Sequence, residues 1–489
     1  MRLSKSRFLA GLQCHKRLYL LVHQPEIVGE PDEMAQAKID EGMKVGQFAR
    51  ALFQKGALVE VRNGNLEKAI AETSRLMRDS KTLAIFEATF DHMKVLVRVD
   101  ILQRVGRGNG WKLIEVKSSS NRKDYYLADV AIQRFVLDGL GFKVDPCLML
   151  LNREYVYDGK SYDLEKLFKI VDVTAETDAL MEGIPAEIRA QLEMLSKDTV
   201  PEVQPGPQCL KPFPCEFFDL CNKPVPADDI SCLPNLSRAK FERLMKLGVT
   251  SIRDIPSDFS LTKYQQHARA AAVSGEAWFS TDLKKKLGDL EYPLYFMDFE
   301  TLGPAIPRFA GMHPFDHIPF QWSVHVRRKP GSQLEHYEFL AEDATDPRPA
   351  FLKRLLQVTG DAGHVIVYNQ SFESGVLARL AEHFPEYEPA VSRLQARLWD
   401  LLPVIRSHTY HMDYRGSFSI KDVLPALVPE MTYEGMGVKE GQQAGVIWDI
   451  MIHGRLSEAE KKKAEQDLLA YCCQDTFAMV RLLEVLQDI

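Results

Sequence analysis

Hydrophobic and polar positions alternate over short runs in the first 150 residues, and elsewhere they recur with helical spacing. Three runs rich in β-branched and aromatic residues predict strands, the first two joined by a hairpin around Asp91-His92: Ala84–Phe90, Val95–Leu102 and Trp111–Lys117. Two segments with apolar residues about every 3.6 positions predict helices: Met34–Phe53 and Leu127–Leu140. The first part of the chain therefore alternates helix and strand.

The middle of the chain has a different character. Residues 201–226 contain seven prolines, which excludes a long helix there. The character changes again over Leu236–Ala272, where Phe241–Ile255 reads as a helix, a glycine-containing turn and a second short helix that begins near Thr250. This segment resembles a helix-hairpin-helix unit, which grips a phosphate backbone through turn amides, and a plain helical linker is the alternative.

Strands come before helices in the last 200 residues. The strands are expected at Pro293–Glu300, Pro319–Val326 and His364–Asn369, and the helices from Glu373 onward, at Val391–Ile405 and at Ser457–Gln487. This order favours a mixed α/β layer fold. We therefore expect an α/β protein with domains at residues 1–227 and 289–489, separated by a small helical linker at residues 228–288.

Composition narrows the class of protein. A chain of 489 residues that is 45% hydrophobic and 26% charged is typical of a globular protein with more than one core. No apolar run approaches the ~20 residues that span a bilayer, and the basic N-terminus has too short an apolar run for a secretory signal, so we expect a cytoplasmic protein without a membrane partner. A net charge of −7 excludes coating of nucleic acid by bulk charge and leaves local basic clusters for any such contact.

Acidic residues near the C-terminus form the first candidate site. Asp298 and Glu300 alternate onto one side of a strand end. Tyr471 and Asp475 lie one turn apart on a helix face. Polar groups that converge in this way are costly unless cations neutralise them, and two divalent metals serving phosphodiester cleavage are the usual solution. The alternative is a strand cap and a solvated helix residue.

Three motifs, Asp298-Phe-Glu300, Val365–Glu373 and Tyr471-x3-Asp475, resemble in order and spacing the DEDD exonuclease superfamily, whose fold is RNase H-like. The resemblance implies one Mg²⁺ or Mn²⁺ held by Asp298, Glu373 and Asp475, and a second held by Asp298 and Glu300. The Tyr471 hydroxyl would orient the attacking water. Glu373 stands where the family usually has Asp. Ser417–Lys421 resembles a segment that supports the site in some relatives.

A second constellation lies in the N-terminal part. Asp100 ends one strand, and Glu115 and Lys117 share a face at the end of the next. This Asp…Glu-x-Lys pattern resembles the PD-(D/E)XK nuclease superfamily, whose restriction-endonuclease-like fold and metal site, here Asp100 and Glu115, it implies. Gln133 resembles the glutamine of the family's helix motif. Gln47 falls roughly where the family has a metal-ligand histidine, and Glu87 is a substitute acid or an exposed strand residue.

Eight cysteines are distributed unevenly. Cys14 and the evenly spaced Cys209, Cys215 and Cys221 resemble the four-cysteine iron–sulphur nucleases of the RecB-like group. The resemblance implies a [4Fe–4S] cluster on these four thiolates, with Phe213, Phe217 and Phe218 as a dry shield. A structural Zn²⁺ site is the runner-up and incidental burial the third possibility. The other cysteines are expected to be small buried hydrophobes: Cys147, Cys232, Cys472 and Cys473.

Taken whole, the chain resembles a bacterial family that joins a RecB-like iron–sulphur nuclease to a DEDD-like exonuclease. This implies a metal-dependent nuclease with two sites, acting as a DNA exonuclease in repair, phage defence or foreign-DNA processing. The nucleic-acid partner is expected to be DNA. Two alternatives stay open: a 3′–5′ RNA exonuclease of the RNase D type, and an inactive iron–sulphur protein that binds nucleic acid or serves as a scaffold.

Overall fold

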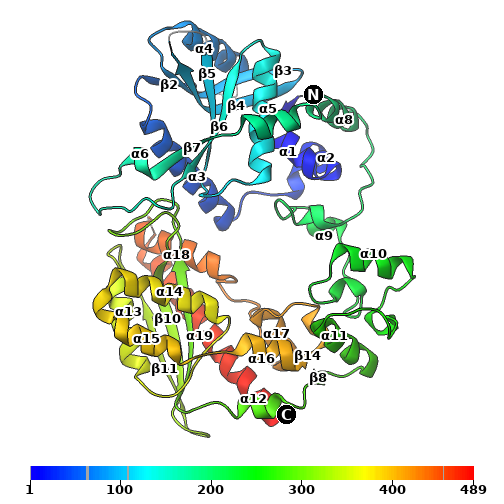
Figure 1. The fold of residues 1–489 in the computed structure, drawn as a ribbon, viewed down its shortest axis with the longest axis vertical. Helices are drawn as coiled ribbons and strands as arrows, with labels where there is room; N and C mark the ends of the chain where they lie inside the picture. The colour runs from blue at the N-terminus through cyan, green and yellow to red at the C-terminus, as the bar shows by residue number, and fades with distance from the viewer. Residues whose placement is uncertain (1, 62–64, 107–109, 455) are drawn as a thin grey trace. The chain divides into compact units, whose positions relative to one another are not determined.

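The computed structural model describes residues 2–61, 65–106, 110–454 and 456–489 (Figure 1). The chain divides into two compact units. The first consists of Met1–Lys223 together with Pro304–Asp316, and the second of Pro224–Gly303 and His317–Ile489. Both units are mixed α/β. Among the described residues, no helix combines the length and apolar character needed to cross a bilayer.

The first unit is built on a seven-stranded sheet of order β2-β3-β4-β5-β6-β7, with β1 paired to β4. Its strands are β1 Leu3–Ser4, β2 Gly56–Leu58, β3 Ala84–His92, β4 Val95–Val105, β5 Gly110–Lys117, β6 Val144–Leu151 and β7 Phe168–Asp172. Strands β3, β4 and β5 are antiparallel neighbours, and β5 and β6 are parallel. The three strands predicted from the sequence are confirmed.

Helices cover both faces of this sheet. The helices are α1 Lys5–Gln13, α2 His15–His23, α3 Glu33–Ala51, α4 Leu66–Arg78, α5 Asp124–Gly139, α6 Leu164–Leu167, α7 Thr174–Met181, α8 Ile184–Leu195 and α9 Phe218–Cys221, with 3-10 turns η1 Pro25–Ile27 and η3 Pro207–Cys209. Leu113 and Leu148 pack with α1 and α5, whereas Ile114 and Met149 pack with α3 on the other face. Because both faces are buried, β6 is apolar without a break from Pro146 to Leu151 rather than alternating.

The hairpin turn differs from the expectation. It lies at Met93 and Lys94, both with positive φ (50° and 62°), and His92 pairs with Val95. Asp91 and His92 remain in β3. Asp91, at this end of the strand, forms an ion pair with Arg2, with Nε and Oδ2 2.6 Å apart. Tertiary contacts therefore override the local turn preference of Asp91.

The second unit contains a five-stranded sheet of order β11-β10-β9-β12-β13. Its strands are β9 Leu294–Leu302, β10 Ile318–Arg327, β11 Leu334–Leu340, β12 Val365–Val367 and β13 Leu398–Asp400. Strand β10 is antiparallel to β9 and β11, whereas β12 is parallel to β9 and β13. The expected strands at Pro293–Glu300, Pro319–Val326 and His364–Asn369 are confirmed as β9, β10 and a shorter β12.

Helices of this unit lie on both sides of the sheet (Figure 1). They are α13 Arg348–Thr359, α14 Gln370–His383, α15 Glu388–Ala396, α16 Leu401–His408, α17 Ile420–Leu427, α18 Gly441–His453 and α19 Glu458–Asp488. The expected helix at Ser457–Gln487 is confirmed as α19. Ser457 and Glu460 form a capping box at its N-terminus. The expected single helix at Val391–Ile405 is wrong. It is interrupted by β13, because Asp400 accepts hydrogen bonds from the Asn369 and Gln370 amides and draws this segment beside β12.

Residues 228–288 share the core of the second unit. Their elements are η4 Ile230–Cys232, α10 Arg238–Lys246, η5 Ile252–Asp254, α11 Lys263–Ser274, β8 Trp278–Phe279 and α12 Leu283–Leu287, and the rest of the unit adds η6 Pro385–Tyr387, β14 Thr409–Tyr410 and η7 Met412–Tyr414. Leu244, Ile252 and Ala268 pack in one cluster with residues of α16 and α19. The short second helix expected near Thr250–Ile255 is only the 3-10 turn η5. The Gly248 and Val249 amides of the preceding turn donate to Met245 and Leu244 carbonyls, so they are not free for a phosphate.

Candidate metal and catalytic sites

Strand β9 and helices α14 and α19 bring the C-terminal acidic residues together. Asp298 and Ser323 are cross-strand neighbours, and Ser323 Oγ lies 2.7 Å from Thr476 Oγ1 of α19. This face of β9 and β10 is therefore covered by α19, which carries Tyr471 and Asp475. Glu373 is buried in the first turn of α14, as the sequence predicts.

The pKa values of these acids report their proximity. Burial raises the pKa of Asp298 and of Glu300 well above the usual range. The charge of Asp475 raises the pKa of Asp298 further, and the charges of Asp298 and then Asp475 do the same for Glu300. Burial and then Asp298 raise the pKa of Glu373 to about 9. Burial also raises the pKa of Asp475, to about 6. Ligand atoms of Asp298, Glu300 and Cys472 lie within 4.8 Å of one another. The acids from three motifs thus form one cluster, defined here as Asp298, Glu300, Glu373 and Asp475.

Two residues beside this acidic cluster have no place in the three motifs. The Tyr433 hydroxyl donates to Asp475 Oδ1 at 2.6 Å. Lys421 Nζ lies 5.1 Å from the ring centre of Tyr471 and 5.5 Å from that of Tyr433, and its charge partly offsets the acids. Lys421 is the last residue of the Ser417–Lys421 segment, whose resemblance to a site-supporting segment already pointed to it. Tyr433 lies in the loop after α17, and its distance along the chain from the three motifs matches no known pattern.

The acidic cluster fits hard divalent cations. The charge of Lys421 acts on Asp298, Glu300 and Asp475. Carboxyl oxygens are the donors that Mg²⁺ and Mn²⁺ prefer. The buried Glu373 Oε2 has no hydrogen-bond partner among the described residues, an expensive condition for a carboxylate oxygen. At Gly441 an added Cβ would lie 3.0 Å from Glu300 Oε2, so glycine leaves room beside this acid. The acidic cluster is therefore a group of side chains that could hold divalent ions.

The N-terminal constellation is also assembled, with additional members. Lys117 Nζ donates to Glu115 Oε1 at 2.7 Å and also pairs with Asp129 of α5. Lys5 of α1 donates to the same Glu115 oxygen at 2.7 Å and lies 3.1 Å from Asp129 Oδ1. Gln133 Nε2 donates to Glu115 Oε2 at 2.8 Å. Lys5 and Asp129 were missed by sequence reasoning because neither belongs to a local motif with Glu115.

Two lysines offset most of the acidic charge in this second group, called here the N-terminal cluster and consisting of Lys5, Asp100, Glu115, Lys117 and Asp129. Burial alone would raise the pKa of Glu115, but Lys117 and Lys5 outweigh it and hold that pKa below its usual value. Burial and Glu115 raise the pKa of Asp100 to about 7, and Asp100 Oδ2 accepts the Val116 amide at 2.8 Å. A metal binding here would have to displace the lysines from Glu115, unlike a metal in the acidic cluster.

The two other residues considered for this site lie elsewhere. Gln47 is exposed on α3. Glu87 has a φ of +56° and lies 3.2 Å from Arg98 and 3.6 Å from Arg50, so it serves ion pairs rather than Asp100 or Glu115.

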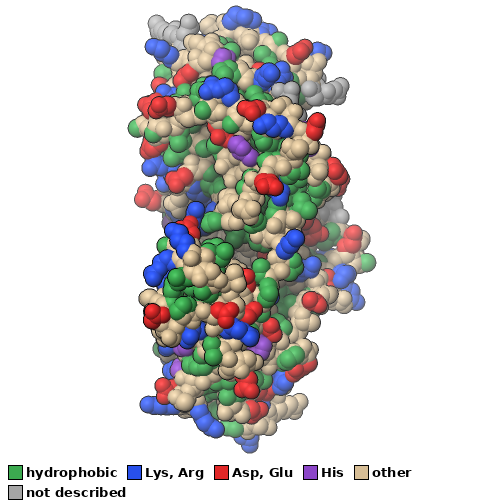
Figure 2. Space-filling model, turned by 90° about the vertical axis from the view of Figure 1, so that its right-hand side faces the viewer, with side chains coloured by type: hydrophobic (Ala, Val, Ile, Leu, Met, Phe, Trp, Pro, Cys, Tyr) green, Lys and Arg blue, Asp and Glu red, His purple; other side chains and the backbone are tan. Residues whose placement is uncertain are grey.

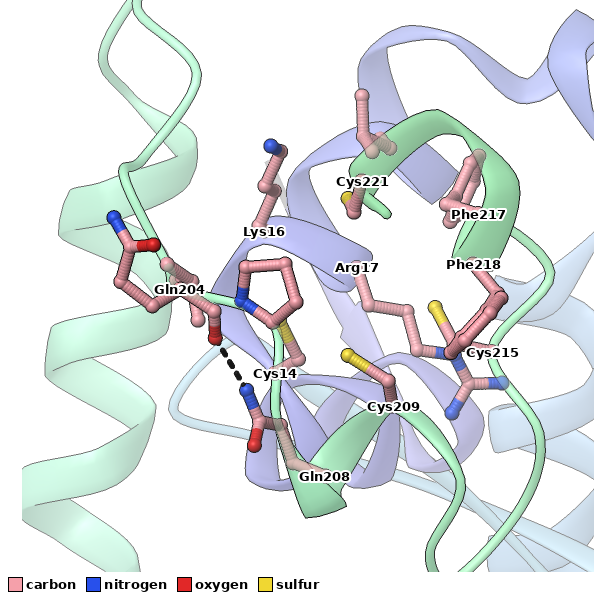
Figure 3. Close-up of a pocket in the computed structure, with 13 residues that line it drawn as sticks. Cys14, Lys16, Arg17, Gln204, Gln208, Cys209, Cys215, Phe217, Phe218 and Cys221 are labelled. Atoms are coloured by element: carbon pink, nitrogen blue, oxygen red, sulfur yellow. Dashed lines mark hydrogen bonds between the residues drawn. The ribbon is translucent and has the colours of Figure 1, made fainter. Parts of the chain in front are cut away.

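The four cysteines line one cavity of the first unit (Figure 3). Cys14 lies between α1 and α2, Cys209 ends η3, Cys221 ends α9, and the sulphur atoms face a shared space. Among the described residues, no three of these sulphurs lie within 4.8 Å of one another. Four thiolates bound to one Zn²⁺ at ~2.3 Å would be separated by only ~3.8 Å. These sulphurs are therefore not at the spacing of ligands around one Zn²⁺.

Two of the three expected shielding phenylalanines line this cavity, Phe217 and Phe218. Phe213 does not. It packs against Tyr125 with ring centres 4.7 Å apart, and its carbonyl accepts a hydrogen bond from Gln13. Arg17 also makes a bidentate ion pair with Glu216, both bonds at 2.7 Å. The proline-rich segment therefore has sources of order besides its cysteines.

Comparison with known families matches part of the second unit. Residues 295–419 match the family model described as a domain of unknown function, DUF2779. This range contains β9 from its second residue onward, with Asp298 and Glu300, and α14 with Glu373. It ends before Lys421 and α19. No curated protein and no solved structure matches the chain.

Proposed function

We propose that this chain is a metal-dependent nuclease whose principal phosphodiester-cleaving site is the acidic cluster. The observation that carries the proposal is the meeting of four carboxyls from β9, α14 and α19, with raised pKa values and one nearby lysine. Such a cluster is unfavourable by itself and becomes favourable when cations and a phosphate occupy it.

The sheet supports an RNase H-like, DEDD-type assignment. The central strand β9 carries Asp298 and Glu300, with antiparallel strands on one side and parallel strands on the other. Within the proposal, Asp298, Glu373 and Asp475 hold one divalent ion, and Asp298 and Glu300 hold the other. Paired ions would stabilise the attacking and leaving oxygens of an in-line displacement.

Tyr471 has the properties of a group that positions water. Burial, Asp475 and Glu300 raise its pKa, so its phenol stays protonated at neutral pH. It lies close enough to Asp475 for a hydrogen bond that lowers the pKa of that acid. Tyr433 donates to Asp475 as well, which fixes this carboxylate on α19. Tyr471 would orient the attacking water, while Tyr433 positions Asp475.

The N-terminal cluster is proposed as a second site of the PD-(D/E)XK type. Asp100 and Glu115 would hold its metal, and Lys117 would contact the scissile phosphate. The four cysteines of this unit would hold a [4Fe–4S] cluster that joins the α1–α2 junction to residues 209–221. Their shared cavity supports this assignment.

DNA is the proposed substrate, bound through local contacts. Figure 2 shows one face of the molecule on which Lys and Arg side chains are interspersed with Asp and Glu. With a net charge of −7, affinity must come from short basic segments and from metal-bound phosphate.

The test is an end-labelled cleavage assay with Mg²⁺ or Mn²⁺ on single-stranded DNA, duplex DNA and matched RNA. Wild type is compared with Asp298→Asn, Glu115→Gln and the double variant, with the exposed Asp488→Asn of the same helix α19 as control. We expect Asp298→Asn to remove most metal-dependent cleavage and the double variant to remove all of it. Cleavage of RNA alone would reassign the substrate. Nucleic-acid binding without any metal-dependent cleavage would overturn the proposal in favour of a scaffold.

A further inference from the structure

Three side chains that could ligate a metal ion lie outside both clusters. The two on the sheet, on β10 and β11, are on the same sheet face as Asp298. His325 of β10 and His336 of β11 are direct cross-strand neighbours, with ring centres 4.4 Å apart. Cys473 of α19 faces them, and one ligand atom from each of the three residues lies within 4.8 Å of the others. No motif of the sequence includes this group.

Hydrogen bonds fix the orientation of both imidazole rings. His336 Nε2 lies 2.9 Å from Ser323 Oγ, and His325 Nδ1 lies 2.8 Å from Thr476 Oγ1. Ser323 Oγ and Thr476 Oγ1 are 2.7 Å apart. Thr476 Oγ1 donates to the Cys473 carbonyl at 3.1 Å, an oxygen that can only accept.

The donors and acceptors of these hydrogen bonds can be assigned from the Thr476 end of the network. With the Thr476 proton assigned to a carbonyl, Thr476 accepts from His325 Nδ1 and from Ser323, and Ser323 in turn accepts from His336 Nε2. The remaining nitrogens, His325 Nε2 and His336 Nδ1, then carry lone pairs. Metal-binding histidines are typically held in this way, with the second ring nitrogen donating to a fixed acceptor.

The electrostatic surroundings suit a cation. Burial lowers the pKa of His325 to about 4, so this ring is neutral at physiological pH. Burial lowers the pKa of His336 and raises the pKa of the Cys473 thiol. The negative charge of Glu338, two positions from His336 on β11, opposes the first shift and adds to the second. His336 is exposed, so an ion has a path from solvent.

We propose that His325, His336 and Cys473 bind one zinc-class transition-metal ion, which ties α19 to strands β10 and β11. Two imidazoles and a thiolate form a nitrogen and sulphur set that selects Zn²⁺ over Mg²⁺ or Ca²⁺. Such an ion would leave a fourth position for water or the Glu338 carboxylate. This inference is independent of nuclease activity.

Zinc content of the full chain tests the site. Wild type, His336→Ala, Cys473→Ser and the control Cys147→Ser are loaded with Zn²⁺, desalted and measured by elemental analysis. Cys147 is buried in the first unit, far along the chain from this group. We expect His336→Ala and Cys473→Ser each to lose about one zinc per chain, relative to wild type and the control. Equal zinc content in all four proteins would overturn the proposal.

A second readout needs no variant. Cys473 is partly exposed, so alkylation at this residue can be followed by peptide mass spectrometry. We expect Zn²⁺ to protect Cys473 in the wild-type protein, and Mg²⁺ at the same concentration to give no protection. Alkylation of Cys473 that is unchanged by Zn²⁺ would contradict the site even where a variant fails to fold.

Discussion

Replacing Asp298 with asparagine should stabilise the metal-free protein while it removes activity. Asp298 and Glu300 have ligand atoms within 4.8 Å of each other, and Asp475 adds to the charge around them. At 4.8 Å and an effective dielectric constant of ~20, two carboxylate charges repel by about 3.5 kcal/mol. Proton uptake relieves part of this cost in the wild type, so we expect a gain of about 1–3 kcal/mol for Asp298→Asn near pH 8.

Thermal unfolding followed in EDTA and in Mn²⁺ measures the effect. For a unit of this size, 1 kcal/mol corresponds to roughly 2–4 °C, so the variant should melt about 2–12 °C above the wild type in EDTA. With Mn²⁺ the order should reverse, because the wild type gains binding energy that the variant has lost. The exposed Asp488→Asn should match the wild type in both buffers.

The reversal of order is the decisive outcome. A variant that is less stable than the wild type in EDTA, or that gains as much from Mn²⁺, would show that these carboxyls neither repel one another nor share an ion. Reduced activity alone would not rescue the reasoning, because a misfolded variant also loses activity.

The remaining predictions concern charge, pH and the cysteines. Glu115→Gln should lower the free energy of unfolding of the first unit, measured in urea, by about 2–3 kcal/mol. This is below the ~3–5 kcal/mol typical of a broken buried ion pair, because Asp129 still pairs with Lys5 and Lys117. Unchanged stability would contradict the buried network. The metal-free protein should lose stability as pH rises from about 4 through about 6 and about 9, since the raised pKa values of Asp475 and Glu373 favour the folded state only while these acids are protonated. Saturating Mn²⁺ should flatten that slope, and a melting temperature that rises over this range in EDTA would refute the sign. Cys215→Ser should abolish the visible absorbance of anaerobically reconstituted protein but leave the far-UV circular dichroism largely intact, because Arg17 and Gln13 also hold the segment; an unchanged spectrum would exclude Cys215 as a cluster ligand.

Local patterns predicted most strands and helices because each depends on nearby residues. The period of Ser457–Gln487 and its capping box describe α19 almost to the residue. The errors arise where distant contacts decide. Arg2 engages Asp91 and the turn moves to Met93 and Lys94, and Asp400 bonds the start of α14 and divides an expected helix.

The candidate sites show the same division. Motif spacing found Asp298, Glu300, Glu373 and Asp475, because each lies in a short recognisable pattern. It did not find Lys5, which reaches Glu115 from a position 110 residues earlier in the chain. Nor did it find Tyr433 or the pairing of His325 with His336, which exist only because β10, β11 and α19 meet.

The placement of Pro304–Asp316 limits how this polypeptide can be cut. These residues connect β9 to β10, yet Ala305 and Ile306 are buried in the core of the first unit, and the Ala305 amide donates to Glu41 at 2.8 Å. The Tyr162 hydroxyl donates to the Pro307 carbonyl at 2.9 Å. A fragment that stops at Lys223 would lack part of its own interior and expose Tyr155 and Tyr157. Expression of either half alone is therefore a poor route to a soluble domain, and inactivating substitutions in the intact polypeptide are the better way to separate the two proposed activities.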